Sequence, residues 1–88
     1  MKYRSSANII SSILTIANGG SSRVGILYKC YLSHEQFKKF MSKLIKDELI
    51  TIEGKSRIYR TTPKGLKLLQ AIRQLEDMLH IDADSVAQ

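Results

Sequence analysis

Residues 21–46 read SSRVGILYKCYLSHEQFKKFMSKLIK and predict two helices joined by a tight turn. Ser21 and Ser22 are N-cap candidates for a first helix of about two turns, whose apolar stripe ends at Cys30. Ser33 and Gln36 have the Ser-x-x-Gln spacing of a capping box, in which each side chain accepts a hydrogen bond from the other residue's backbone N–H. A second helix is therefore expected to begin directly after Ser33.

This second helix divides into an apolar and a cationic face at the 3.6-residue period. The apolar positions are Phe37, Phe40, Met41, Leu44 and Ile45. The opposite positions are Gln36, Lys38, Lys39, Ser42, Lys43 and Lys46. The apolar face is expected to pack on the rest of the protein, which leaves the cationic face for solvent or an anionic partner.

The flanking sequence predicts one more helix before this pair, and a hairpin and a helix after it. Apolar residues recur at helical spacing from Ala7 to Ala17, and Asn18-Gly19-Gly20 ends that helix. Residues 49–53 and 56–61 favour two strands around Gly54, and Thr62-Pro63 begins a last helix that runs to about His80. The order is helix, helix, helix, strand, strand, helix, a mainly α (α+β) fold.

A helix pair with a tight turn, followed by a hairpin, is the layout of a winged helix-turn-helix, whose second helix enters the DNA major groove. We expect a three-helix core with a two-stranded wing over residues 1–62, a dimerisation helix over 63–80 and a flexible tail over 81–88. Gln36 and Ser42 are the better candidates for reading base edges, and lysines for contacting phosphates. The predicted DNA-binding residues are Ser21, Ser22, Arg23, His34, Gln36, Lys38, Lys39, Ser42, Lys43, Lys46, Lys55, Ser56 and Arg57.

Composition is consistent with one small, folded, basic domain. The chain has 88 residues, of which 43% are hydrophobic, and a net charge of +6. Residues 1–60 hold eleven Lys or Arg against four Asp or Glu, whereas residues 61–88 hold three against four. An anionic partner is therefore expected to meet the first two thirds of the chain, with a different task for the last helix.

Other chemistry finds little support in the sequence. Cys30 is the single cysteine and is expected to be a buried small hydrophobe, while His34 and His80 are expected to face solvent. No zinc spacing or nucleophile pairing is present, so we expect neither an enzyme nor a metal or other cofactor. With no apolar run long enough for a membrane span and no secretory signal, the expected location is cytoplasmic. A small-molecule effector is not predictable.

Five aromatic residues bear on the kind of nucleic acid. Tyr28, Tyr31, Phe37, Phe40 and Tyr59 occupy mostly core-like positions, which favours packing over base stacking. Duplex rather than single-stranded nucleic acid is therefore the expected ligand.

The last helix carries a short heptad seam of Leu68, Ile72, Leu75 and Leu79. Leu66 and Leu69 are expected to turn toward the winged domain. The seam predicts a homodimer, and the alternative is that these residues all pack on their own domain, since two to three heptads are few for a stable seam.

The chain resembles the small winged helix-turn-helix regulators of archaea, which include dimeric chromatin-associated proteins with a C-terminal coiled-coil helix. The resemblance rests on the run from Tyr28 to Ser33 leading into Phe37 to Leu44, on Leu49-Ile50 before the wing, and on the run from Tyr59 to Gly65. It implies DNA binding as a homodimer, with His34–Lys46 in the groove and Glu53–Arg60 beside it. Members with long coiled coils continue further than the helix of about 18 residues expected here, so a shorter dimer contact is expected.

The leading hypothesis is a duplex-DNA-binding transcription regulator that acts as a homodimer, with residues 34–47 in the major groove and residues 53–60 on the flanking backbone. Two alternatives remain at this point. One is a winged-helix module for protein–protein interaction, because a fold does not fix a function. The other is architectural packing of DNA without sequence preference.

Overall fold

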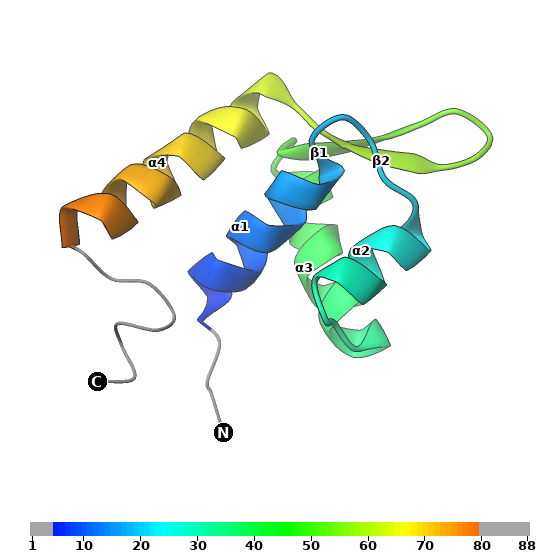
Figure 1. Cartoon of the computed structure of the whole chain (residues 1–88). Helices are drawn as coiled ribbons and strands as arrows, with labels where there is room; N and C mark the ends of the chain where they lie inside the picture. Colours follow the sequence, from blue (N-terminus) through cyan, green and yellow to red (C-terminus); the bar gives the residue numbers. More distant parts are fainter. Residues whose placement is uncertain (1–4, 80–88) are drawn as a thin grey trace.

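The computed structural model describes residues 5–79 and contains four helices and one hairpin (Figure 1). The elements are α1 (Ser6–Ala17), α2 (Arg23–Lys29), α3 (His34–Lys46), β1 (Ile50–Glu53), β2 (Ile58–Thr61) and α4 (Pro63–Leu79). The predicted order and fold class are confirmed. His80 and the predicted tail 81–88 lie outside the described residues.

Side-chain caps begin the first three helices where the sequence predicts them. The hydroxyl of Ser5 accepts from the backbone N–H of Asn8, and that of Ser22 accepts from the N–H of Gly25. At α3 both halves of the Ser33–Gln36 capping box are present. The helix predicted to end at residue 47 ends at Lys46, because Asp47 is its C-cap.

The first three helices and the hairpin enclose a single apolar core among the described residues. Ile13 and Leu14 of α1, Ile26 of α2, Leu44 of α3 and Ile50 of β1 are almost completely buried. Cys30 is buried with them, as expected. The core is the apolar face of each amphipathic helix turned inward, which leaves the polar faces outside.

The hairpin pairs β1 with β2 in antiparallel register, with Ile52 opposite Tyr59. A third segment, which the sequence analysis did not predict, joins the other edge of β2. Ser21 and Tyr59 exchange two backbone hydrogen bonds, with N···O distances of 2.9 and 2.8 Å. The wing is therefore joined through the backbone to the residue that precedes the cap of α2.

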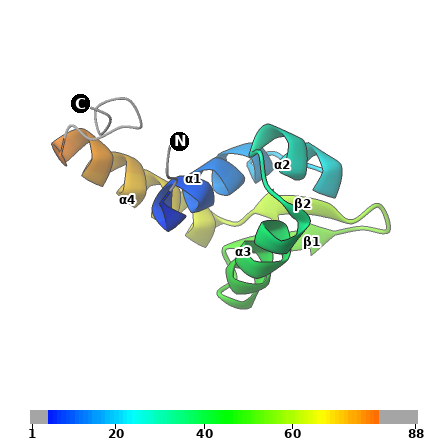
Figure 2. The ribbon, with the colours of Figure 1, turned by 90° about the horizontal axis from the view of Figure 1, so that it is seen from below.

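Helix α4 is packed against the core only along its first half. Leu69 is buried, and Leu66 and Leu68 are half-buried against the core. Further along, Leu75 and Leu79 are more than half exposed. Figures 1 and 2 show the end of α4 and the tip of the hairpin at opposite ends of the molecule.

The expectation that the aromatic residues are in the core is wrong for Tyr28 and Tyr31. Their exposed fractions are 78% and 86%, whereas Phe37 and Tyr59 are buried and Phe40 is half-buried. Tyr28 follows Val24 by four residues on the outer side of α2, and Tyr31 has a left-handed backbone (φ 55°) in the turn that follows. The aromatic residues therefore no longer argue against stacking with unpaired bases.

A close backbone contact at Gly65 holds the start of α4 against Leu49, the residue directly before β1. The Leu49 carbonyl accepts from the backbone N–H of Thr62 at 3.0 Å, and the Thr62 hydroxyl accepts from the N–H of Gly65 at 3.0 Å. A Cβ at position 65 would collide with this same Leu49 oxygen and lie 2.8 Å from a methyl carbon of Thr61. Only glycine fits here without moving α4 or the strand.

We therefore predict that Gly65→Ala lowers the free energy of unfolding by roughly 1–3 kcal/mol, the usual cost of overpacking a tight site. Urea denaturation measures the change. The control is Lys67→Ala on the exposed side of α4, where a change within about 0.5 kcal/mol is expected. Equal stability of the two variants would show that the contact at Gly65 does not constrain α4.

Candidate nucleic-acid interface

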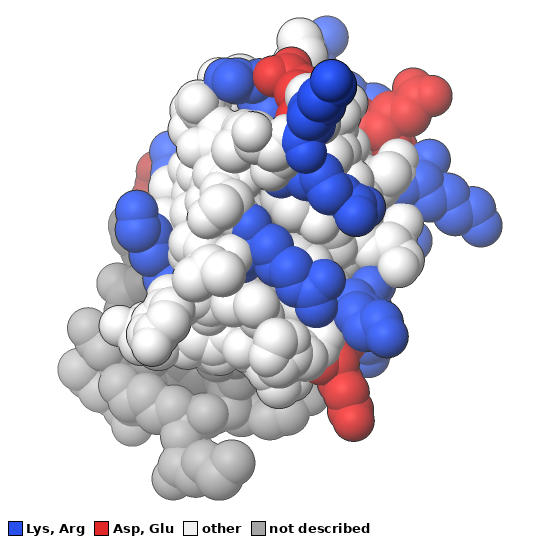
Figure 3. Space-filling view, turned by 90° about the vertical axis from the view of Figure 1, so that its right-hand side faces the viewer, with Lys and Arg blue, Asp and Glu red and all other residues white. Residues whose placement is uncertain are grey.

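The outer side of α3 presents cations to solvent. All seven residues that the sequence analysis assigned to this helix are exposed: His34, Gln36, Lys38, Lys39, Ser42, Lys43 and Lys46. Figure 3 looks at the molecule from the side of α2 and the wing, and shows Lys and Arg side chains projecting from it, with acidic side chains mainly at its margins. The four lysines of α3 are thus exposed, and Lys39 also makes a contact within the protein, since its Nζ lies 5.7 Å from the centroid of the Phe40 ring.

The exposed side of α3 has two parallel stripes. His34, Lys38 and Ser42 follow each other at four-residue spacing and share one stripe. His34 touches Arg23 of α2, with 3.5 Å between Arg23 Nη2 and His34 Nδ1. This stripe therefore borders the start of α2. The second stripe is Gln36, Lys39, Lys43 and Lys46, in which Lys43 forms an exposed ion pair with Asp47 at 3.5 Å.

Gln36 is less available for base reading than the sequence analysis expects. Its side-chain oxygen accepts the Ser33 backbone N–H at 3.0 Å in the capping box. Bidentate recognition of adenine needs both the oxygen and the nitrogen of the amide. The capping hydrogen bond occupies one of the two lone pairs of this oxygen and holds the amide near the start of α3, which restricts how the amide can meet a base.

The start of α2 is fixed against α3 by Arg23. Its Cζ lies 4.8 Å from the centroid of the Phe37 ring, which is a cation–π contact. Ser22 is exposed but its hydroxyl oxygen caps α2, and Ser21 is half-buried with its hydroxyl donating to the Ser22 carbonyl at 3.2 Å. Of the three residues predicted here, Arg23 has the side chain best placed to meet a phosphate.

The tip of the wing carries the other predicted cations. Lys55, Ser56 and Arg57 are all exposed. Arg57 has a φ of 54°, a conformation that costs a residue with a Cβ about 1–2 kcal/mol. On the adjoining strand Arg60 is paired with Glu53, with 2.7 Å between Nε and Oε1. Lys55 and Arg57 are therefore the cations of the wing that have no acidic partner among the described residues.

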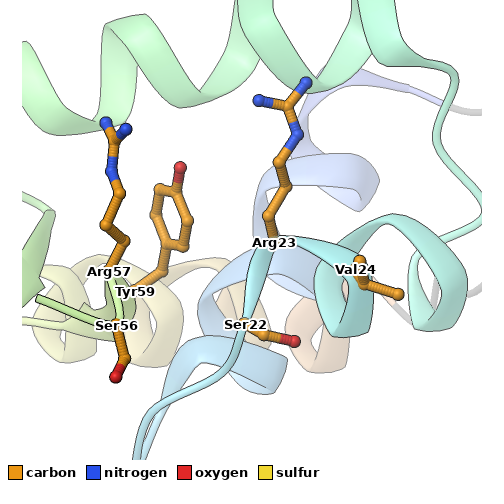
Figure 4. A pocket seen from close by; sticks show the side chains of 6 residues that line it. All are labelled: Ser22, Arg23, Val24, Ser56, Arg57 and Tyr59. Carbon is orange, nitrogen blue, oxygen red and sulfur yellow. The ribbon is translucent and has the colours of Figure 1, made fainter.

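A cavity of about 330 Å³ lies between the start of α2 and the wing. It is lined by Ser22, Arg23, Val24, Ser56, Arg57 and Tyr59 (Figure 4). Four of these residues were predicted from sequence, on two segments more than 30 residues apart, and the Ser21–Tyr59 bridge brings the segments together. The cavity thus joins two of the three predicted contact regions, and the His34 stripe adjoins it through Arg23.

Sequence reasoning missed two residues of this surface. Glu35 is exposed between the two stripes of α3, and a carboxylate accepts hydrogen bonds from cytosine N4 in the major groove. Tyr59 was assigned to the core, which holds for its ring but not for its hydroxyl, since Tyr59 lines the cavity. The available signal for Tyr59 was chemical: a buried tyrosine hydroxyl usually needs a partner.

Two other kinds of site are absent from residues 5–79. No three His, Cys, Asp or Glu side chains gather there closely enough to hold a metal ion. In the same range, no helix is both long and apolar enough to cross a membrane.

Three helices around one core, a tight turn before an outward-facing α3 and a two-stranded wing beside it define a winged helix-turn-helix protein. The chain belongs to the winged helix-turn-helix family, whose sequence model matches residues 3–80. No curated protein matches the sequence significantly.

Among solved structures, the fold is similar to the crystal structure of Sso10a-2, a DNA-binding protein from Sulfolobus solfataricus. The TM-score is 0.79 at 22% sequence identity, and the match covers 88% of this chain and 83% of the other. The expectation of a winged helix-turn-helix relative is confirmed at the level of the fold.

The left-handed backbone of Arg57 leads to a stability prediction. Glycine pays no Cβ penalty at positive φ, so Arg57→Gly is expected to be more stable than Arg57→Ala by about 0.5–1 kcal/mol in urea denaturation. At Lys55, whose φ is not positive, the order is expected to reverse. If glycine is the less stable variant at both positions, the turn does not hold Arg57 in the left-handed region.

Proposed function

We propose that the protein binds duplex DNA with α3 in the major groove and the wing on the flanking backbone. The observation that carries the proposal is the exposure of cations from α2, α3 and the wing tip beside one another, on elements held by a common core. The DNA-binding description of Sso10a-2, the structural neighbour, supports it. Lysines of α3 neutralise phosphates, and Ser42 and Glu35 are the base-reading candidates.

At a finer level, we propose a transcription regulator of archaeal type that acts as a homodimer on a partly palindromic site. Residues 1–62 bind DNA, and residues 63–80 hold two copies together. Architectural DNA packing differs from this only in its preference for sequence, so selection of bound fragments from a random duplex pool separates the two. Specific binding enriches one motif, and packing enriches none.

The DNA proposal predicts a strong dependence on salt and on particular lysines. Affinity for a duplex should fall steeply between about 50 and 200 mM salt, because each phosphate contact releases counterions. Lys39→Ala and Lys43→Ala should each weaken binding and lower the slope of log K against log salt by roughly 0.9. Fluorescence anisotropy with a labelled duplex measures both quantities.

Lys67→Ala on α4 is the matched control, since it removes the same charge from the exposed side of another helix. The assignment of α3 is refuted if Lys67→Ala weakens binding as much as the two α3 variants. Unlabelled single-stranded DNA serves as a competitor, because Tyr28 and Tyr31 are exposed. Competition as effective as that of duplex would show that the ligand is single-stranded.

The exposed apolar residues at the end of α4 support the homodimer. Leu75, Met78 and Leu79 have exposed fractions of 57%, 78% and 55%, and Leu75 and Leu79 lie on one face at four-residue spacing. Leu68 is half-buried against its own core, so the proposed seam has shifted toward the C-terminal end relative to the sequence-based one. A second copy that covers this face would remove three large apolar side chains from water.

The dimer proposal predicts a mass of twice the 10.0 kDa chain at micromolar concentration in analytical ultracentrifugation. Leu75→Asp should give monomers, because a carboxylate on the buried face of a dimer is costly. Gln74→Asp, which adds the same charge at an exposed position one residue away, should remain dimeric. A monomeric wild type, or a Leu75→Asp variant that stays dimeric, rules out this seam.

One observation favours a second function, as a protein-interaction module. Val24 and Tyr28 are exposed on α2 and Tyr31 is exposed in the turn after it, and exposed aromatic residues are typical of interaction surfaces. This function predicts a DNA affinity no better than that of an unrelated basic protein of equal charge, which the same anisotropy assay measures.

A further inference from the structure

The hydroxyl of Tyr59 has no hydrogen-bond partner among residues 5–79. The Tyr59 and Phe37 rings form a T-shaped pair, with centroids 5.6 Å apart and an interplanar angle of 87°, and Tyr59 is only 6% exposed. None of the described residues forms a hydrogen bond with its hydroxyl. Every fully enclosed side-chain nitrogen or oxygen among the described residues has a hydrogen-bond partner. Because the Tyr59 hydroxyl has none, it is not fully enclosed, and we place its open side at the cavity that Tyr59 lines.

Two guanidinium groups flank this hydroxyl from different elements. In Figure 4 the side chains of Arg23, Tyr59 and Arg57 stand side by side, and their polar ends point to the same side, toward α3. Arg23 contacts Phe37 and His34, whereas Arg57 projects from the wing turn, where its backbone is left-handed (φ 54°). Neither arginine forms an ion pair with a carboxylate among the described residues.

The three groups offer hydrogen-bond donors and positive charge with no carboxylate among the residues that line the cavity. Guanidinium groups match the oxygens of a phosphate in geometry and charge, and a tyrosine hydroxyl adds a donor. A backbone phosphodiester has two unesterified oxygens and one negative charge. The cavity therefore suits a phosphate that is approached from the α2 side and from the wing side at once.

We propose that Arg23, Tyr59 and Arg57 together hold one phosphodiester of the DNA backbone. This contact would fix the depth and register of α3 in the groove. The inference rests on the proposed function and goes beyond it. It makes Tyr59 a DNA contact, and it assigns two arginines 34 residues apart to one shared phosphate. The start of α2 and the wing would then contact the same phosphate from two sides.

The first test removes only the hydroxyl. Tyr59→Phe keeps the ring contact with Phe37, and its urea stability should equal that of the wild type because the hydroxyl bonds to none of the described residues. Its Kd for duplex should rise about tenfold, the usual effect of losing a hydrogen bond to a charged group, with an unchanged salt slope. Tyr28→Phe, which removes an exposed hydroxyl outside the cavity, should bind as the wild type does.

The salt slope then tests whether the phosphate is shared. If Arg23 and Arg57 hold one phosphate, Arg23→Ala and Arg57→Ala should each weaken binding with little change in slope, because the remaining arginine still neutralises it. The double variant should lose roughly 0.9 in slope. Separate phosphates would instead give a loss of roughly 0.9 for each single variant and twice that for the double, which overturns the shared site. Arg73→Ala on α4 is the control for loss of an arginine.

The results distinguish failure of the phosphate-site proposal from failure of the DNA-binding proposal. If the wild type binds duplex but Tyr59→Phe leaves Kd unchanged, the site is wrong and DNA binding stands. Failure of the wild type to bind duplex at about 50 mM salt refutes the proposed function itself.

Inorganic phosphate, titrated at constant ionic strength and followed by NMR, tests whether the cavity binds a free anion instead of a phosphate of DNA. Saturation below 1 mM that is lost in Tyr59→Phe, with no effect of this variant on duplex binding, would show a small-anion site instead.

Discussion

Phe37 is where three elements of the molecule meet. Its ring lies on the buried side of α3, meets the Tyr59 ring of β2 in a T-shaped contact, and has the guanidinium of Arg23 from α2 over its face. Tyr59 in turn pairs through its backbone with Ser21, directly before the cap of α2. The contact therefore sets the relative positions of α2, α3 and the wing. A change in this packing would displace the cationic groups that these elements carry.

The same junction explains how a small domain holds long cationic side chains in a defined arrangement. A lysine on a helix surface is mobile, because holding its long side chain in one place costs side-chain entropy. Arg23 is different, since stacking on Phe37 restricts it before any ligand arrives. Arg57 has no such contact within the described residues, and only its backbone, at a φ of 54°, is in a defined turn. Arg23 is therefore the cation whose position is fixed in advance, and the exposed lysines of α3 supply charge without a fixed position.

Local sequence signals predicted the elements well, and long-range contacts account for what they missed. Caps, helical periodicity and the Gly-containing turn are encoded within a few residues, so α3 and the hairpin were predictable. The Ser21–Tyr59 bridge joins residues 38 apart and leaves no local pattern. Tyr28 and Tyr31 were misassigned because an aromatic residue near an apolar stripe is usually buried, and only the path of the chain shows that α2 turns Ile26 and Cys30 inward instead. The double use of Gln36 and the open hydroxyl of Tyr59 likewise depend on which partners the folded chain brings close.

The wing and the exposed end of α4 lie at opposite ends of the molecule (Figure 2), so the proposed DNA-binding surface and the proposed dimer surface do not overlap. The central claim is that α2, α3 and the wing form one continuous surface for duplex DNA. Its most direct test is NMR titration of the ¹⁵N-labelled full chain with a short duplex at low salt. The account predicts shift changes concentrated in residues 22–24, 34–46 and 54–59, with residues 70–79 unaffected. Changes centred on α4 or on the outer side of α1, or none at all, would contradict it.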